Sequence, residues 1–119
     1  MLFRSVRIRS LSGGNIQKLI LGRVLSRKPK LIVANQPTWG LDVGAVAAIH
    51  EHLVATCTEG AGVLLISEDL EEIMALADRI AVMSRGHLSE ARAKSEWTLA
   101  SLGLAMTATT AESEAARAA

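Results

Sequence analysis

The chain has 119 residues, 50% of them hydrophobic and only one a cysteine, so it can bury a core but forms no internal disulfide and no zinc site built on several cysteines. The formal net charge is +1, yet residues 1–41 carry eight Lys or Arg and no carboxylate, whereas residues 42–119 carry five basic and twelve acidic side chains. This asymmetry predicts that the first part faces an anion such as phosphate, nucleic acid or a lipid surface.

The first half of the chain alternates between helix and strand signals. A turn at residues 12–14 leads into apolar residues at helical spacing, which predicts a helix over residues 13–26. The apolar run at residues 31–34 is typical of a buried parallel strand. Asp42 is expected to cap a second helix, which ends before Gly60 and Gly62.

The second half continues the alternation. Residues 63–66 predict another buried strand, followed by Ser67 as the expected N-cap of a helix. The apolar face of this helix is expected to consist of Leu70, Ile73, Met74 and Ala77. Residues 80–83 predict a third strand, and residues 97–104 a last short helix. The alternation of helices and strands predicts a layered α/β architecture with a largely parallel sheet.

The ends of the chain carry weaker signals. Residues 1–10 are rich in Arg and Ser, as in an organelle transit peptide, but the motif that starts at Leu11 favours a mature domain instead. Residues 1–106 are expected to form the domain, and residues 107–119, which lack large apolar side chains, a disordered tail. The longest aliphatic runs are too short to cross a bilayer.

The string LSGGNIQK, at residues 11–18, is the most specific in the chain. Gly13 and Gly14 let the backbone approach a ligand closely, and the following helix directs its free N–H groups to the same place. Ser12 adds a hydroxyl donor and Lys18 adds positive charge. The string predicts an anion site, with a serine N-cap before a glycine turn as the alternative.

A second string, LIVANQPTWGLD, covers residues 31–42. Ligands of open α/β sheets bind beyond the carboxyl ends of the strands, which makes Asn35 and Gln36 candidate site residues. A simple turn built on Asn-Gln-Pro is the alternative.

These strings together resemble the ATP-binding cassette (ABC) transporter ATPases. LSGGNIQK is similar to the family signature, LIVANQPTWGLD to its Walker B segment and D-loop, and LLISEDLEEI, at residues 64–73, to its switch-histidine segment. The resemblance covers about residues 10–105 and points to the second cassette of the tandem ATPases of sugar and nucleoside importers. It implies a partial P-loop NTPase fold with three layers around a mainly parallel sheet.

The chain departs from the family at the positions that carry hydrolysis. In the active form a Walker B Asp holds the Mg²⁺ sphere and an adjacent Glu orients or deprotonates the attacking water. The chain has Asn35 and Gln36 there, and an amide supplies neither charge nor useful basicity. Glu68 replaces the histidine that contacts the γ-phosphate, and a carboxylate there repels phosphate. The resemblance therefore implies a degenerate site with no catalytic residue intact.

The resemblance also implies partners. Two cassettes of this family pack head to tail, so that the signature of one covers the ATP held by the other. The resemblance implies that ATP with Mg²⁺ is bound mainly by a partner cassette. It also implies that Asp42 lies at the interface between the two cassettes. Transmembrane permease subunits and a peripheral location on the cytoplasmic face of the inner membrane are implied as well. Four residues of this chain are expected to contact the ATP phosphates in trans: Ser12, Gly13, Gly14 and Gln17.

The G-x-x-x-x-G-K-[ST] phosphate loop does not occur in these 119 residues, so we interpret the chain as the carboxyl-terminal half of one cassette, inactive alone. The alternative is a truncated, non-catalytic dimerisation or interaction module.

Nucleic-acid binding by the basic segment is disfavoured because stacking needs interleaved aromatic residues, and only Phe3 and Trp39 lie there. No metal site of the chain's own is expected. Half a cassette exposes strand edges and apolar surface, which predicts poor solubility in isolation.

Overall fold

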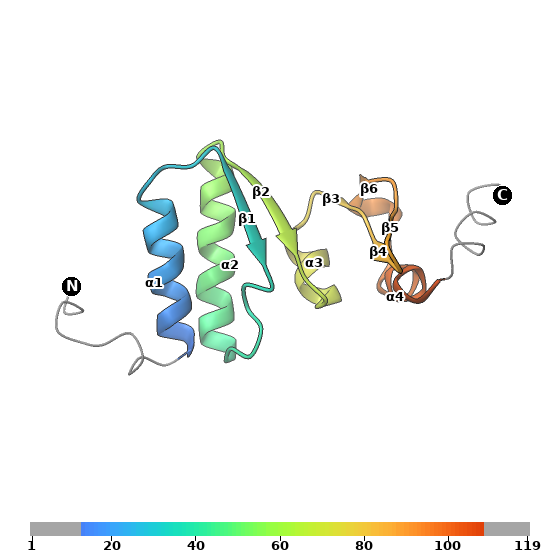
Figure 1. Cartoon of the computed structure of the whole chain (residues 1–119), viewed down its shortest axis with the longest axis horizontal. Coiled ribbons are helices and arrows are strands. Elements are labelled where there is room, and N and C mark those ends of the chain that lie inside the picture. The colour runs from blue at the N-terminus through green and yellow to red at the C-terminus, as the bar shows by residue number, and fades with distance from the viewer. Residues whose placement is uncertain (1–12, 109–119) are drawn as a thin grey trace. The chain divides into compact units, whose positions relative to one another are not determined.

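A computed structural model describes residues 13–108 of the chain, in two units whose boundary lies between Ile66 and Ser67 (Figure 1). The first unit contains α1 (Gly13–Leu25), β1 (Leu31–Asn35), α2 (Val43–Thr58) and β2 (Gly62–Ile66). The second contains α3 (Leu70–Leu76), β3 (Arg79–Ile80), β4 (Met83–Ser84), β5 (His87–Leu88), β6 (Arg92–Ala93), the short 3-10 helix η3 (Lys94–Glu96) and α4 (Leu99–Thr107). Ser12 and most of the expected tail lie outside the described residues.

In the first unit, β1 and β2 pair in parallel, from Leu31 opposite Gly62 to Asn35 opposite Ile66. Helix α2 connects the two strands, as a parallel pair requires. Helices α1 and α2 lie side by side and run back against the direction of the strands (Figure 1). The predicted order of helix, strand, helix and strand is confirmed.

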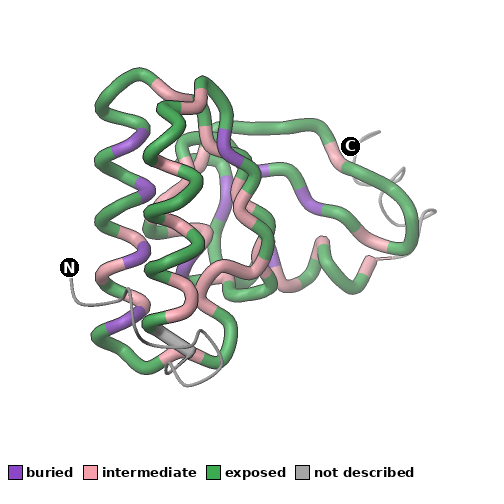
Figure 2. The backbone as a smooth tube through the Cα atoms, turned by 60° about the vertical axis from the view of Figure 1, so that its left-hand side comes forward, coloured by how far each residue is buried: buried purple, intermediate pink, exposed green. Residues whose placement is uncertain are grey.

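One face of α2 supplies most of the core of this unit. Its buried residues recur every three or four positions, which is the spacing of a single helix face (Figure 2). Ile32, the second residue of β1, is buried as well. The buried residues of α2 are Ala45, Ile49, Leu53 and Thr56.

The other side chains of the β1–β2 pair form an exposed aliphatic face, which we call the open sheet face. Parallel sheets of α/β proteins normally bury both faces. Within the described residues this face stays in contact with solvent, as predicted for half a cassette. It consists of Leu31 (62% exposed), Val33 (60%), Leu64 (53%) and Ile66 (45%).

The prediction of a third parallel strand over residues 80–83 is wrong. β3 ends at Ile80 and β4 begins at Met83, and each pairs antiparallel, β3 with β6 and β4 with β5. Arg85 (φ 49°) and Gly86 (φ 79°) both adopt the left-handed conformation that a two-residue hairpin turn needs. This turn folds β5 back onto β4 and prevents a longer strand.

Asp69, rather than the predicted Ser67, caps α3. The Asp69 carboxylate accepts hydrogen bonds from the N–H groups of Glu71 (3.0 Å) and Glu72 (3.1 Å), while the Ser67 hydroxyl accepts from Asp69 N–H (3.0 Å). A carboxylate complements the positive end of the helix dipole better than a neutral hydroxyl does. Glu68 therefore precedes α3 and its cap.

The core of the second unit is small and centred on Trp97. The Trp97 indole N–H donates to the carbonyl of Ile80 (3.3 Å), and the Arg92 guanidinium lies 4.0 Å from the ring centroid. Trp97 comes before the last helix rather than within it, since Thr98 caps α4 through Ser101 N–H. The buried residues of this core are Ile80, Val82, Trp97 and Leu102.

Candidate functional site

The predicted site residues between positions 13 and 42 come to one end of the first unit (Figure 1). Gly13 and Gly14 open α1, Asn35 ends β1, and Asp42 immediately precedes α2. This is the end to which the carboxyl termini of the parallel strands point, where α/β proteins place their ligands. Gln17 lies in the following turn of α1 and is half-buried.

The structure does not place two of the predicted site residues, Ser12 and Glu68, in this group. Ser12 lies outside the described residues. Glu68 lies in the loop that follows β2, at the start of the second unit, and its side chain is exposed.

The start of α1 has the electrostatic character of an anion site. The first N–H groups of a helix have no partner within the helix, and the dipole places partial positive charge there. The first turn of α1 contains no acidic side chain, and Lys18 is exposed one turn further on. These properties suit a phosphate group.

The backbone of Gln36 joins the ends of the two strands. Its N–H donates to the carbonyl of Ile66 (2.7 Å), and its carbonyl accepts from Trp39 N–H (3.3 Å). Gln36 has a φ of 47°, a left-handed conformation that costs a residue other than glycine about 1 kcal/mol or more. Such strain persists only where surrounding contacts impose it, which marks this turn as a position of functional interest.

Asp42 caps α2, as predicted. Its Oδ1 accepts a hydrogen bond from Ala45 N–H (2.8 Å), and its carbonyl accepts from Val46 N–H (2.9 Å). The turn before it is closed by the N–H of Leu41, which donates to the carbonyl of Thr38 (3.2 Å). The carboxylate itself remains exposed at the surface of the unit.

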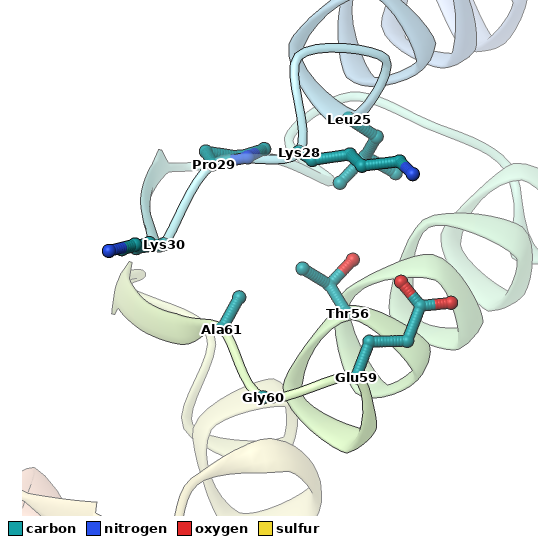
Figure 3. A pocket seen from close by; sticks show the side chains of 8 residues that line it. All are labelled: Leu25, Lys28, Pro29, Lys30, Thr56, Glu59, Gly60 and Ala61. Carbon is teal, nitrogen blue, oxygen red and sulfur yellow. The ribbon is translucent and has the colours of Figure 1, made fainter.

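A pocket of about 640 Å³ lies at the opposite end of the first unit, where the strands begin (Figure 3). Lys30 and Ala61, which precede β1 and β2, line it together with Lys28 and Glu59. The hydroxyl of Thr56, also in the lining, donates to a carbonyl of its own helix. The pocket shares no residue with the candidate site, and the motifs of the sequence did not point to it.

Within residues 13–108, no group of three or more His, Cys, Asp or Glu side chains is arranged to hold a metal ion. Among the helices of this part, none has the length and apolar character needed to span a membrane.

Solved structures that match this fold include ATP-binding cassettes of ABC transporters, and the fold is the partial P-loop NTPase fold that the motifs implied. An ATP-binding cassette of an ABC transporter matches with a TM-score of 0.66 at 28% identity, over 76% of this chain and 36% of that chain. A nucleotide-free cassette from an ABC transporter matches with a TM-score of 0.64 at 30% identity, over 71% of this chain and 33% of that chain.

Relatives of curated function indicate which ABC ATP-binding proteins the chain resembles. The glucose import ATP-binding protein TsgD13 of Haloferax volcanii is 52% identical over 97 residues, which are 82% of this chain and 18% of that protein. The guanosine import ATP-binding protein NupO of Bacillus subtilis is 49% identical over 102 residues, which are 86% of this chain and 20% of that protein. The chain belongs to the ABC ATP-binding family and is similar to the ATP-binding proteins of sugar and nucleoside importers. It spans about a fifth of the length of these relatives. No family model matches the chain.

Proposed function

We propose that the chain is part of the ATP-binding subunit of an importer for simple sugars or nucleosides. We propose further that its signature motif, at the start of α1, contacts ATP that is held by a partner cassette. The start of α1 supports this role, because it combines Gly13 and Gly14 with a first turn that lacks acidic side chains. The neighbouring Asp42 is placed by the same proposal at the interface with the partner. Transmembrane permease subunits and the cytoplasmic face of the membrane complete the proposed setting.

The observation that carries the proposal is the chemistry at the carboxyl end of β1. Asn35 and Gln36 present amides where Mg²⁺ coordination and water activation need carboxylates. These residues do not fit the Mg²⁺ of a bound nucleotide, so hydrolysis by the chain's own site is not proposed. The exposed Glu68 carboxylate adds a negative charge that is unfavourable to phosphate.

The test measures ATP turnover by the 119-residue chain alone and mixed with the amino-terminal half of B. subtilis NupO. We expect no turnover by the chain alone and stimulated turnover in the mixture. Gly14→Asp places a negative charge at the start of α1 and is expected to abolish the stimulation. Gly22→Asp is the matched control, because it lies on the same helix and a Cβ there meets no atom within 4 Å.

Two results would overturn the proposal. One is robust hydrolysis by the chain alone. The other is equal stimulation by the wild type and the Gly14→Asp variant, which would show that the start of α1 does not act on the partner's nucleotide.

The open sheet face favours a second candidate, a module that associates with the ATPase without affecting its chemistry. Its four aliphatic side chains form a surface suited to association. The same mixture distinguishes the two functions, because such a module binds the NupO half without changing its turnover.

A further inference from the structure

Positive charge is concentrated along α1 and in the loop that leads from it to β1. Residues 13–30 contain five Lys or Arg and no Asp or Glu, and all five basic side chains are exposed. Within the described part of the chain, none of the five forms an ion pair. Four of them lie toward the end of α1 that is far from the candidate site, and we call this group the basic edge: Arg23, Arg27, Lys28 and Lys30.

Exposed aliphatic side chains accompany the basic edge on α1. Leu19 is 40% exposed, Ile20 53% and Val24 38%. Arg23 lies four residues after Leu19 and three after Ile20, so these three side chains are neighbours on the helix surface. Arg27 is next to Val24, because its N–H donates to the Val24 carbonyl (3.3 Å). This side of α1 therefore presents hydrocarbon and positive charge together.

The lysines of the basic edge do not converge on one point. Lys28 and Lys30 line the pocket at this end of the unit, but their side chains point away from each other (Figure 3). The carboxylate of Glu59 also borders the pocket and repels an anion there. A compact anion such as free phosphate is held by convergent donors, whereas cations spread over a surface suit an extended anionic partner.

Two extended anionic partners, a nucleic acid and an anionic lipid surface, differ in what they bring to the aliphatic side chains. Binding to nucleic acid uses aromatic side chains that stack on bases, and residues 13–30 contain no aromatic residue. A lipid surface has hydrocarbon directly beneath its phosphates. Aliphatic side chains enter that hydrocarbon while Lys and Arg stay among the headgroups. The mixture of side chains along α1 therefore favours a lipid surface.

We propose that α1 lies against an anionic lipid surface, with the basic edge at the lipid phosphates and the aliphatic side chains of Leu19, Ile20 and Val24 in the outermost hydrocarbon. Each cation held near such a surface strengthens binding about fivefold, and the attraction decreases as the salt concentration rises. The inference goes beyond the proposed function, because it needs neither nucleotide nor a partner cassette. It gives the first unit a contact with the membrane that does not depend on a permease subunit.

The experiment measures binding of the 119-residue chain to vesicles by flotation on a density gradient, which separates bound chain from aggregate. Vesicles of phosphatidylcholine with phosphatidylglycerol are compared with vesicles of phosphatidylcholine alone, without nucleotide. We expect the chain to float with the anionic vesicles, less so as the salt concentration rises, and to stay at the bottom with the neutral ones. Duplex DNA is added as a competitor, and we expect it to displace less chain than anionic vesicles of equal total charge.

Two pairs of variants assign the binding to α1. Arg23→Gln is expected to weaken binding about fivefold, and Arg85→Gln, which removes an exposed cation from the turn between β4 and β5, is its matched control. Ile20→Ser is also expected to weaken binding about fivefold, because it removes aliphatic surface. Its control is Leu88→Ser, since Leu88 is exposed (60%) but lies in β5. Arg27→Gln repeats the charge test beyond the last residue of α1, where it does not perturb the helix.

Four results contradict a lipid contact of α1. Absence of flotation excludes it, and equal flotation with neutral and anionic vesicles shows that apolar surface binds lipid without selecting charge. Equal affinities within either pair of variants show that α1 is not the contact. Tighter binding to duplex DNA than to anionic vesicles assigns the basic edge to nucleic acid. Because nucleotide and partner cassette are absent from these measurements, none of these results bears on the proposed function.

Discussion

Asp42 combines a structural and a proposed interface role, and two substitutions separate them. Its Oδ1 accepts from Ala45 N–H at 2.8 Å, and the first turn of α2 contains no other acidic side chain. Asp42→Ala removes the cap, worth about 1 kcal/mol, and the charge near the dipole, worth about 0.5 kcal/mol. Asp42→Asn keeps an acceptor in the same place, so we expect a loss of only about 0.5 kcal/mol.

The assay is urea unfolding followed by circular dichroism, combined with hydrogen exchange at the amide of Ala45. We expect Asp42→Ala to lose about 1.5 kcal/mol and to speed exchange at that amide. Thr58→Ala is the control at the other end of α2, where the hydroxyl donates only to a carbonyl of its own helix (3.0 Å). It is expected to leave both measurements nearly unchanged.

The relation between the two Asp42 variants can refute this reasoning. Equal losses for Asp42→Ala and Asp42→Asn would show that charge, rather than the acceptor at 2.8 Å, stabilises α2. The same variants test the interface when they are titrated with the NupO half. If Asp42→Asn binds it as the wild type does, the carboxylate has no role across the interface.

Three further predictions concern the fold. Lys28→Gly relieves a left-handed residue (φ 47°) and should raise the free energy of unfolding by up to about 1 kcal/mol; a decrease would contradict the strain. Leu102→Ala empties a site that is 1% exposed and should cost about 3 kcal/mol and weaken the near-ultraviolet dichroism of Trp97; a loss below about 1 kcal/mol would contradict this packing. Val33→Lys charges the open sheet face and should raise the soluble fraction at unchanged helix content, whereas a fall in helix content would show that the face is packed.

The sequence by itself determined the features that depend on near neighbours along the chain. The Asp42 cap needs only a carboxylate and an amide three residues later, and the structure confirms it. β1 and β2 follow from continuous apolar runs between turn residues. The motifs at residues 11–18 and 31–42 identified the family and the fold, because backbone approach to a phosphate and the end of a strand require particular residue types.

The tertiary structure decided what depends on distant partners. The apolar residues around Ile80 predict a single strand, but the pairing of this segment is set by the turn at Gly86 and by the packing of Trp97, 17 residues away. Burial likewise follows from what covers a side chain and not from its type. Only the structure shows that Trp39 and the open sheet face are exposed, because an apolar residue stays in water wherever no other segment reaches it.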